Sequence, residues 1–495
     1  MDRKSVWRAA PAVLAALAAA AAWAEPSGNG ATLETVAQGA AGEGLAFPAA
    51  QSMMREGSDL LRASEAQAVA KEKDAEADKS LGQPKVTFST KMIWGSKTLD
   101  YGTLSVGSSI AGAAQRYPGL GAVLQSLPAK ARSELAGLKI PLHYKTDIDG
   151  PRMTLAGYWL LYTGGQISAK QEAGEAAARE ARDDLRRDAD ALDRDLAQKY
   201  FGVQLCRAVT KLREDALADQ EREVARAKGF EHAGTLSRLE RMSVEVNRDK
   251  AKRDLLAARA DEKVAVAELS RLLKEKDIGS LATPLFVLKG SVGPLESWQD
   301  AALASSPVLA AYGAKTEQAG ALVKAAKGAY HPTVYAFGEK NLIKNYLTIP
   351  EPDWAAGVGV SFTLWNNRDR AAALASARAT KERAEAGAAE ARSQVLSGVE
   401  VAWLRTTQMQ DQYEPTRSTV ALAEENLRMR EAAFASGLST ANEVWDARTK
   451  VTGAKVEQKV AAYKFVVAWA ALNSAAGTME KFNESIAGPG RAVEQ

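Results

Sequence analysis

Side chains that could carry out acid–base or nucleophilic chemistry are few and lie far apart in the chain. The only histidines are His143, His232 and His331, which we place in a loop, at a helix end and before a strand. The sequence contains no H-E-x-x-H helix, P-loop or G-x-S-x-G turn to position a metal ligand, a phosphate or a nucleophile. Cys206, the only cysteine, cannot form an intrachain disulfide, so we expect a small core residue of a helix. The sequence therefore predicts no enzyme, no metal site and no cofactor.

Hydroxyl and acidic residues do recur at a fixed spacing. The stretch "GTLSRLERMSVE" begins at Gly234, and "GLSTANEVWDAR" begins 203 residues later at Gly437. A hydroxyl residue follows each glycine by three positions, and a glutamate follows after three more: Ser237 and Glu240, then Thr440 and Glu443. A glycine that ends one helix, followed by a capping box that begins the next, predicts a sharp turn between two helices.

These two turns belong to an internal duplication. At the same separation, Leu196 aligns with Val399 and Leu269 aligns with Leu472. Repeat 1 carries an insert of about 45 residues, at about residues 101–150, that repeat 2 lacks. We expect repeat 1 over 58–276, a linker over 277–294, repeat 2 over 295–477 and a C-terminal tail over 478–495.

Long amphipathic helices dominate both repeats. The expected helices are 58–80, 168–231 and 237–273 in repeat 1, and 295–327, 370–435 and 440–476 in repeat 2. Their apolar residues recur in a narrow stripe, which is typical of coiled-coil packing. A helix of about 64 residues is a rod of about 95 Å, so we expect it to lie along an extended assembly. Pro415 predicts a kink or a restart in the second long helix.

We expect four strands of about ten residues, the length of a tilted membrane strand. Apolar residues alternate cleanly in two of them, whereas Met153–Tyr162 is apolar on both faces. Tyr335 and Phe337 sit one residue out of this alternation, and aromatic residues gather in and around the strands, as at a bilayer interface. Four strands cannot close a barrel, so several chains must share one. We expect these residues to face lipid: Val358, Val360, Phe362, Leu364, Val86 and Phe88.

The first 24 residues have the pattern of a cleaved signal peptide. A basic segment, Asp2–Arg8, precedes the apolar stretch Ala9–Ala22 and an A-x-A cleavage site ending at Ala24. We expect residues 25–57 to be an N-terminal segment that is partly disordered. The formal net charge of +3 falls to about +1 without the signal peptide, which argues against a nucleic-acid partner.

In this order, the features resemble the outer-membrane efflux protein family, the TolC-like outer-membrane factors. The resemblance covers about Ser52–Gly477 and includes "YHPTV" at Tyr330 and "GVGVSFTLW" at Gly357. It implies a mixed α+β membrane protein: a homotrimer with a long coiled-coil-like α-helical periplasmic barrel and four strands per chain in a shared trimeric outer-membrane β-barrel. It also implies location in the outer membrane of a Gram-negative bacterium, in contact with lipid and extending into the periplasm.

The resemblance further implies a passive exit duct of a tripartite efflux or type I secretion system. Such a duct docks to a periplasmic adaptor (membrane fusion) protein and, indirectly, to an inner-membrane pump. Glu443 and Asp446 resemble the family's acidic ring at the closed pore entrance, with Glu240 on the neighbouring hairpin, and Ser243 replaces the aspartate in repeat 1. Two tips resemble adaptor-docking sites: Gly234, Thr235 and Leu236, and Gly437, Leu438 and Ser439.

One alternative stays open at this point. A periplasmic coiled-coil scaffold or adhesion protein with a soluble sheet would share the long helices. Osmotic shock would release such a scaffold, whereas a membrane duct would need detergent. The sequence does not identify the cargo, and it does not separate a duct for small molecules from one for polypeptides.

Overall fold

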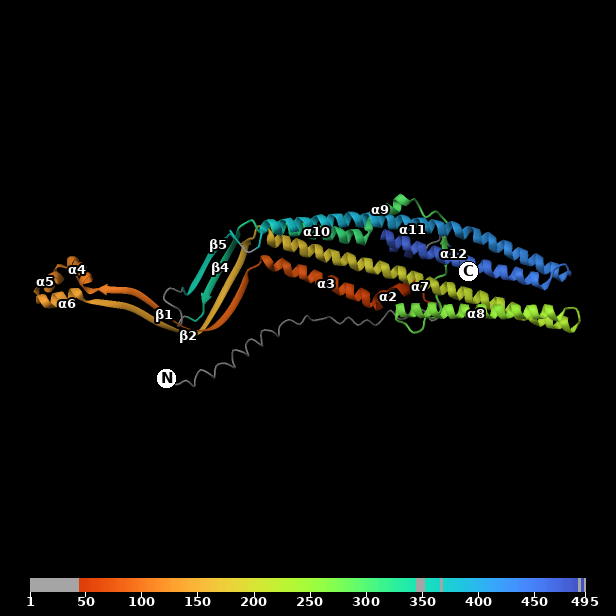
Figure 1. The fold of residues 1–495 in the computed structure, drawn as a ribbon, viewed down its shortest axis with the longest axis horizontal. Helices are drawn as coiled ribbons and strands as arrows, with labels where there is room; N and C mark the ends of the chain where they lie inside the picture. Colours follow the sequence, from red (N-terminus) through yellow and green to blue (C-terminus); the bar gives the residue numbers. More distant parts are fainter. Residues whose placement is uncertain (1–43, 344–351, 366–367, 488–490, 494–495) are drawn as a thin grey trace, which may run out of the picture. The chain divides into compact units, whose positions relative to one another are not determined.

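The computed structural model describes residues 44–343, 352–365, 368–487 and 491–493. Almost all of them belong to one compact unit, Leu45–Gln495 (Figure 1). The predicted signal peptide lies outside the described residues. The part of segment 25–57 that is described is ordered, because it contains the helix α2 (Phe47–Gly57).

The helices and strands follow the predicted order in both repeats. After α2, repeat 1 contains α3 (Asp59–Lys79), a 3-10 turn (Ser80–Gly82), β1 (Lys85–Ser105), α4 (Val106–Arg116), α5 (Pro118–Ser126), α6 (Ala129–Gly137), β2 (Lys139–Tyr162), α7 (Gln166–His232) and α8 (Arg238–Leu273). Repeat 2 contains α9 (Leu295–Ser305), α10 (Pro307–Gly328), β4 (Thr333–Asn341), β5 (Trp354–Ser361), α11 (Arg370–Ala435) and α12 (Ala441–Ala476). The linker strand β3 (Phe286–Leu288) pairs with β6 (Arg491–Val493), which follows α13 (Met479–Ala487).

One prediction about helix continuity is wrong, and at Pro415 the structure excludes one of two predicted alternatives. The run 295–327 is two helices, because Ser306 has extended backbone and Pro307 begins α10 at a position where its missing N–H costs nothing. Helix α11 does not restart at Pro415 but passes through it. The Thr416 hydroxyl donates to the Tyr413 carbonyl at 2.6 Å, and the Thr419 hydroxyl donates to the Pro415 carbonyl at 3.0 Å.

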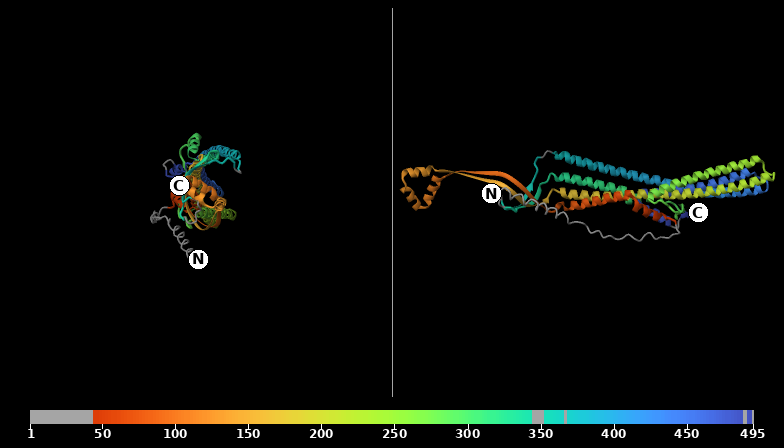
Figure 2. Two further views of the ribbon diagram at one scale, coloured as in Figure 1. Left: turned by 90° about the vertical axis from the view of Figure 1, so that its left-hand side faces the viewer. Right: turned by 90° about the horizontal axis from the view of Figure 1, so that it is seen from below.

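The long helices run side by side, with α7 in contact with α3, α8, α10 and α12. Figure 1 and Figure 2 show the ends of the α7/α8 and α11/α12 hairpins together, away from the four-stranded sheet. In the part of the chain that the structure describes, no helix is both long and apolar enough to cross a bilayer.

The sheet is antiparallel and has the order β1-β2-β4-β5, so β1 and β5 are its edges. Val86 pairs with Gly157, Gly157 with Gly338, and Gly338 with Ala356. Paired residues project to the same face, and alternate residues along a strand do so as well. Val86 and Phe88 of one edge therefore share a face with Val358 and Val360 of the other.

Tyr335 and Phe337 lie on the opposite face of the sheet, which explains their shifted register. A Cβ atom on Gly359 would lie 2.5 Å from the Tyr335 ring, and one on Gly357 would lie 3.2 Å from the Phe337 ring. The two glycines of β5 therefore leave room for the two rings. Tyr158 joins them, with its ring centroid 5.0 Å from that of Tyr335.

The strands of repeat 1 differ from the prediction in length. β1 has 21 residues and β2 has 24, whereas β4 and β5 have 9 and 8. The insert at 101–150 is thus partly a continuation of the β1–β2 hairpin, and its helices are α4, α5 and α6. His143 consequently lies in a strand and not in a loop.

The largest buried cluster lies at the middle of α7. The Phe47 ring of α2 meets those of Tyr200 and of Phe482 of α13 edge to face, with centroids 5.4 Å and 5.5 Å away, and the Phe201 ring lies 5.9 Å from that of Phe286 of β3. All five side chains are almost fully buried. Burial of each is worth about 1.5–3 kcal/mol, so this cluster fastens α2, the linker and α13 to α7.

Side chains of the two long helices satisfy the linker backbone. Gln204 of α7 donates to the carbonyls of Leu281 at 3.0 Å and Thr283 at 2.7 Å. Gln410 of α11 donates to the carbonyls of Leu288 at 2.9 Å and Gly290 at 2.7 Å. Buried carbonyls need such donors, and these bonds fix the linker across both repeats.

A buried charge fixes α2 to α7. The Asp193 carboxylate is fully buried and accepts two bonds from the Arg55 guanidinium, one of 3.2 Å between Nε and Oδ1. Burial, with repulsion from Asp193, raises the pKa of the nearby Asp190 carboxyl to about 6. The unfolded chain titrates this group near pH 4, so Asp190 destabilises the fold increasingly as the pH rises from about 4 to about 6.

We predict that Arg55→Met lowers the free energy of unfolding by about 3 kcal/mol, because it leaves the buried Asp193 carboxylate without its partner. This is the lower end of the range for a broken buried pair, since Arg55 itself is half exposed. Denaturant titration of the helical circular dichroism signal measures the change. Arg62→Met, which removes a surface arginine of α3, is the control and should change little. Equal losses in both variants would contradict this role of Asp193.

Candidate functional site: the hairpin tips

The two predicted turns lie at the ends of the α7/α8 and α11/α12 hairpins. Gly234 has φ of 72° and Gly437 has φ of 73°, a left-handed conformation that glycine adopts without strain. The Thr235 N–H donates to the Phe230 carbonyl at 2.9 Å, and the Leu438 N–H donates to the Ala433 carbonyl at 2.8 Å. Each glycine thus ends one helix and lets the last carbonyls bond back to the turn.

Both capping boxes are present. The Glu240 N–H donates to the Ser237 hydroxyl at 3.2 Å, and the Ser237 N–H donates to Glu240 Oε2 at 2.9 Å. The Thr440 pair has the same bonds, at 3.3 Å and 3.0 Å. Hydrogen bonds from Ser237 lower the pKa of Glu240. Bonds from Ser439 and Thr440, with the charge of Arg430, lower the pKa of Glu443.

The two acids of repeat 2, Glu443 and Asp446, have different surroundings. Glu443 is occupied by its cap and by an ion pair with Arg430 of α11, 3.5 Å away. Asp446 is exposed on α12 and forms no ion pair within the part of the chain that the structure describes. Ser243, its equivalent in repeat 1, lies 3.4 Å from the Asn442 side chain of α12, so the beginnings of α8 and α12 lie close together.

Near its tip, each hairpin has an ion pair between its two helices. The pairs occupy equivalent positions in the two repeats, but the acidic and basic residues are exchanged. In repeat 1, Lys228 of α7 lies 3.9 Å from Glu245 of α8. In repeat 2, Glu431 of α11 lies 2.7 Å from Arg448 of α12, and both positions are shifted by 203 residues. The sequence analysis missed this pair, although the duplication contained the signal.

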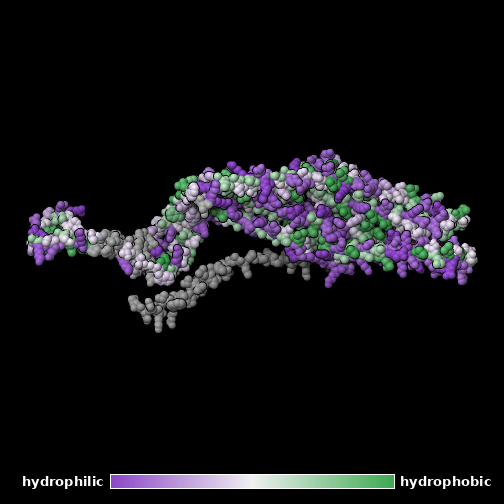
Figure 3. Space-filling model, viewed as in Figure 1, coloured by the Kyte–Doolittle hydropathy of each residue, from purple (hydrophilic) through white to green (hydrophobic). Residues whose placement is uncertain are grey.

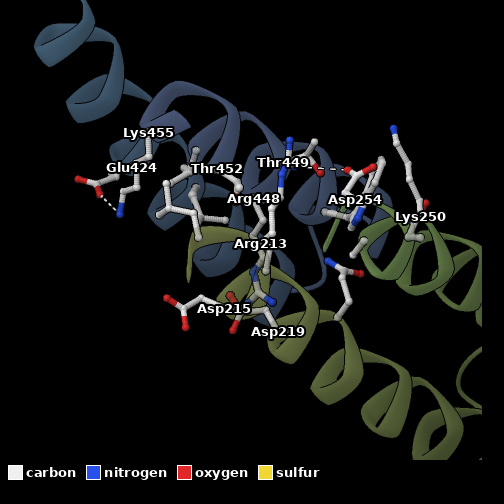
Figure 4. A pocket seen from close by; sticks show the side chains of 18 of the residues that line it. Arg213, Asp215, Asp219, Lys250, Asp254, Glu424, Arg448, Thr449, Thr452 and Lys455 are labelled. Carbon is white, nitrogen blue, oxygen red and sulfur yellow. Dashed lines mark hydrogen bonds and ion pairs between the residues drawn. The ribbon is translucent and has the colours of Figure 1, made fainter. Parts of the chain in front are cut away.

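A cleft of about 360 Å³ separates the two hairpins behind the tips (Figure 4). Charged side chains of both signs line it: Arg213, Asp215, Asp219, Lys250, Asp254, Glu424, Arg428, Glu431, Arg448 and Lys455. Arg213 of α7 reaches Asp254 of α8 at 3.4 Å, and Lys455 of α12 reaches Glu424 of α11 at 2.7 Å. These pairs bind helices within one hairpin, whereas Lys250 of α8 lies over the Trp445 ring of α12, 5.5 Å from its centroid, and so links the two hairpins.

Apolar side chains are exposed at both tips. Leu438 is 84% exposed, and Leu239, on the first turn of α8, is 77% exposed. Leu236 differs, because it packs against Val224 and Val244. Figure 3 shows hydrophobic patches interrupting the hydrophilic surface of the helices.

The predicted strand residues are also exposed. Val358 and Val360 in β5 and Val86 and Phe88 in β1 lie on the same face of the sheet, each more than half exposed. Phe362 and Leu364 are exposed as well, but the prediction that they belong to the strand is wrong, since β5 ends at Ser361.

Comparisons with known proteins point to one family. Residues 298–478 match the family model for outer membrane efflux proteins. The chain is 25% identical over 334 residues to the outer membrane efflux protein BepC of Brucella suis biovar 1 (strain 1330), across 65% of this chain and 70% of BepC. The solved structure of VceC from Vibrio cholerae aligns with a TM-score of 0.65, at 14% identity, over 87% of this chain and 96% of VceC. The CmeC outer membrane channel of Campylobacter jejuni aligns with a TM-score of 0.65, at 12% identity, over 89% of each chain.

The fold is that of the TolC-like channels, with a helical barrel and strands contributed to a β-barrel. Residues 298–478 match the outer membrane efflux proteins, and the curated relative BepC is a member of the same kind, which confirms the resemblance seen in the sequence. The family model lies within repeat 2, and the structural alignments extend over both repeats. Members of this family and fold are exit ducts of the outer membrane, and they are channels, not enzymes.

We predict that Gly437→Ala weakens the tip by about 1 kcal/mol, because a Cβ atom is disfavoured in left-handed backbone. Hydrogen exchange of the amides around residues 434–444 should speed up about fivefold. The matched control is Gly453→Ala, an α12 glycine with open space around it. Tip exchange that is unchanged in the variant would contradict this reading of Gly437.

The capping acids Glu240 and Glu443 have lowered pKa values in the folded protein. Their contribution to the stability of the tips is therefore present above about pH 4.5 and is lost as the pH falls through the folded-state pKa.

Proposed function

We propose that three copies of this chain form a passive duct, which receives cargo from an inner-membrane pump through a periplasmic adaptor. The predicted signal peptide would export each copy, and the sheets would assemble in the outer membrane. One observation carries the proposal: a four-stranded sheet with an open edge at each side and an apolar exposed face. In lipid, every unpaired backbone N–H or C=O costs several kcal/mol, so β1 of one copy must pair with β5 of the next.

The exposed face has the composition expected of a lipid contact. Val86, Phe88, Val358 and Val360 would project into the bilayer, with Trp94 and Trp354, both about 70% exposed, on the same face. The opposite face, with Thr87, Ser89 and the Tyr335 ring, would line the lumen. An apolar face exposed on all strands of one sheet is otherwise an aggregation hazard.

The tips would form the entrance of the duct. The exposed Asp446 carboxylates of three copies would form a ring that attracts cations and repels itself. Glu443 would contribute less, because its charge is balanced by Arg430 and its oxygens are occupied by the cap. Glu240 has the same capping role in repeat 1 and would also contribute little.

The same tips offer a docking surface for an adaptor. The turns 234–236 and 437–439 would meet it, with Leu438 and Leu239 as the exposed apolar contacts. The charged cleft behind them supports movement, because its ion pairs join helices within each hairpin and a cleft separates the two hairpins where a packed core would hold them rigidly. We infer that the hairpins separate at this cleft when the entrance opens.

We predict that Asp446→Asn lowers the cation-over-anion permeability ratio several-fold in single-channel recordings in a planar bilayer, because it removes one carboxylate per copy. Glu443→Gln should lower the ratio less, and the matched control Glu240→Gln should leave it unchanged.

An unchanged ratio in the double variant Glu443→Gln with Asp446→Asn would contradict the assignment of the entrance. The absence of any conductance in the unmodified protein would contradict the duct itself.

A further inference from the structure

The β1–β2 hairpin continues well beyond the rest of the sheet. Pairing between β2 and β4 ends at Thr154 with Asn341, whereas β1 and β2 stay paired as far as Ser105 with Lys139. About 15 residues of each strand therefore form a two-stranded ribbon of about 50 Å. Figure 1 shows α4, α5 and α6 at the end of this ribbon, and we call these helices, residues 106–137, the head.

The head folds on itself but has no core. The Val106 N–H donates to the Leu138 carbonyl at 3.0 Å, which closes the ribbon. A Cβ atom on Gly107 would lie 2.6 Å from the Ala136 carbonyl oxygen, so α4 and α6 touch closely. Even so, no residue of the three helices is buried.

Helix α5 presents an uncharged apolar surface. Tyr117 just before it is 67% exposed, and Leu120 and Val123 within it are 44% and 63% exposed. Leu120 and Val123 are neighbours about one turn apart on the helix, and Tyr117, in extended backbone, adjoins its first turn. α5 contains no charged residue, and the charges of the head lie elsewhere, at Arg116, Lys130, Arg132 and Glu134.

An isolated two-stranded ribbon is marginally stable in water, and so is a small helical unit without a buried core. The surface of α5 therefore needs a cover that the chain does not supply within the described residues. In the shared barrel, which this inference takes from the proposed function, the ribbons of all copies rise from one rim. A second copy of the same helix is thus the nearest apolar surface, and its lack of charge allows close approach.

We infer that the α5 helices of neighbouring copies pack against one another beyond the outer end of the barrel. The heads together form an external cap that stabilises the ribbons and covers the exit of the duct. The side of α5 with Tyr117, Leu120 and Val123 forms this contact, and the charged helix α6 faces away from it.

Disulfide cross-linking in isolated outer membranes tests the inference. Cys206→Ala first removes the only native cysteine, and Val123→Cys then places one thiol on α5. Leu120→Cys is a second reporter on the same side, and Ser133→Cys, exposed on α6, is the matched control. After mild oxidation, both α5 variants should give at least fivefold more covalent dimer than the control, because a disulfide requires Cα atoms within about 7 Å.

The outcomes separate this inference from the proposed function. If both α5 variants cross-link no more than Ser133→Cys while the same preparation conducts ions in a bilayer, the heads do not meet and the inference is wrong. Cross-linking to a different protein would also overturn it, because another partner would then cover α5. If the unmodified protein neither conducts nor assembles, the duct is wrong and the cap falls with it.

Discussion

The pairing of backbone at the two edges of the sheet is the constraint on which the rest depends. β1 and β5 each have a neighbour on one side only, and their shared face is apolar and exposed. In water, the open edges can bond to solvent, but exposure of the apolar face is unfavourable. In lipid, the apolar face is favourable, but the unpaired backbone groups of the edges are not. Only pairing with further copies satisfies both. The proposed entrance and the inferred external cap both rest on that solution.

The helical part serves the same assembly by fixing the two repeats to each other away from the sheet. The aromatic cluster around Phe47 and Tyr200 holds both ends of the described chain and the linker against α7. Toward the tips this packing gives way to ion pairs and a polar cleft. Stability is therefore concentrated at the middle of the helices, and contacts that water can replace hold the hairpin tips, which we propose as the entrance.

Features that depend on residues close together in the sequence, such as helix caps, were predictable. Contacts between separate helices were not. Gly437, Thr440 and Glu443 were identified because a cap depends on residues three positions apart. The Glu443–Arg430 pair was missed, because it depends on how α11 and α12 rotate about their axes. The long ribbon was missed because strands outside a bilayer need no apolar alternation, so nothing marked their continuation beyond Trp94. The break at Pro307 was visible in the sequence, but it was outweighed by the helical pattern on both sides.

Native mass spectrometry of protein extracted from outer membranes by mild detergent tests the central claim most directly. The account predicts a complex of three times the mass of the mature chain, stable while the detergent micelle is retained. A single-chain mass, from protein that osmotic shock alone releases, would contradict the shared barrel and everything built on it.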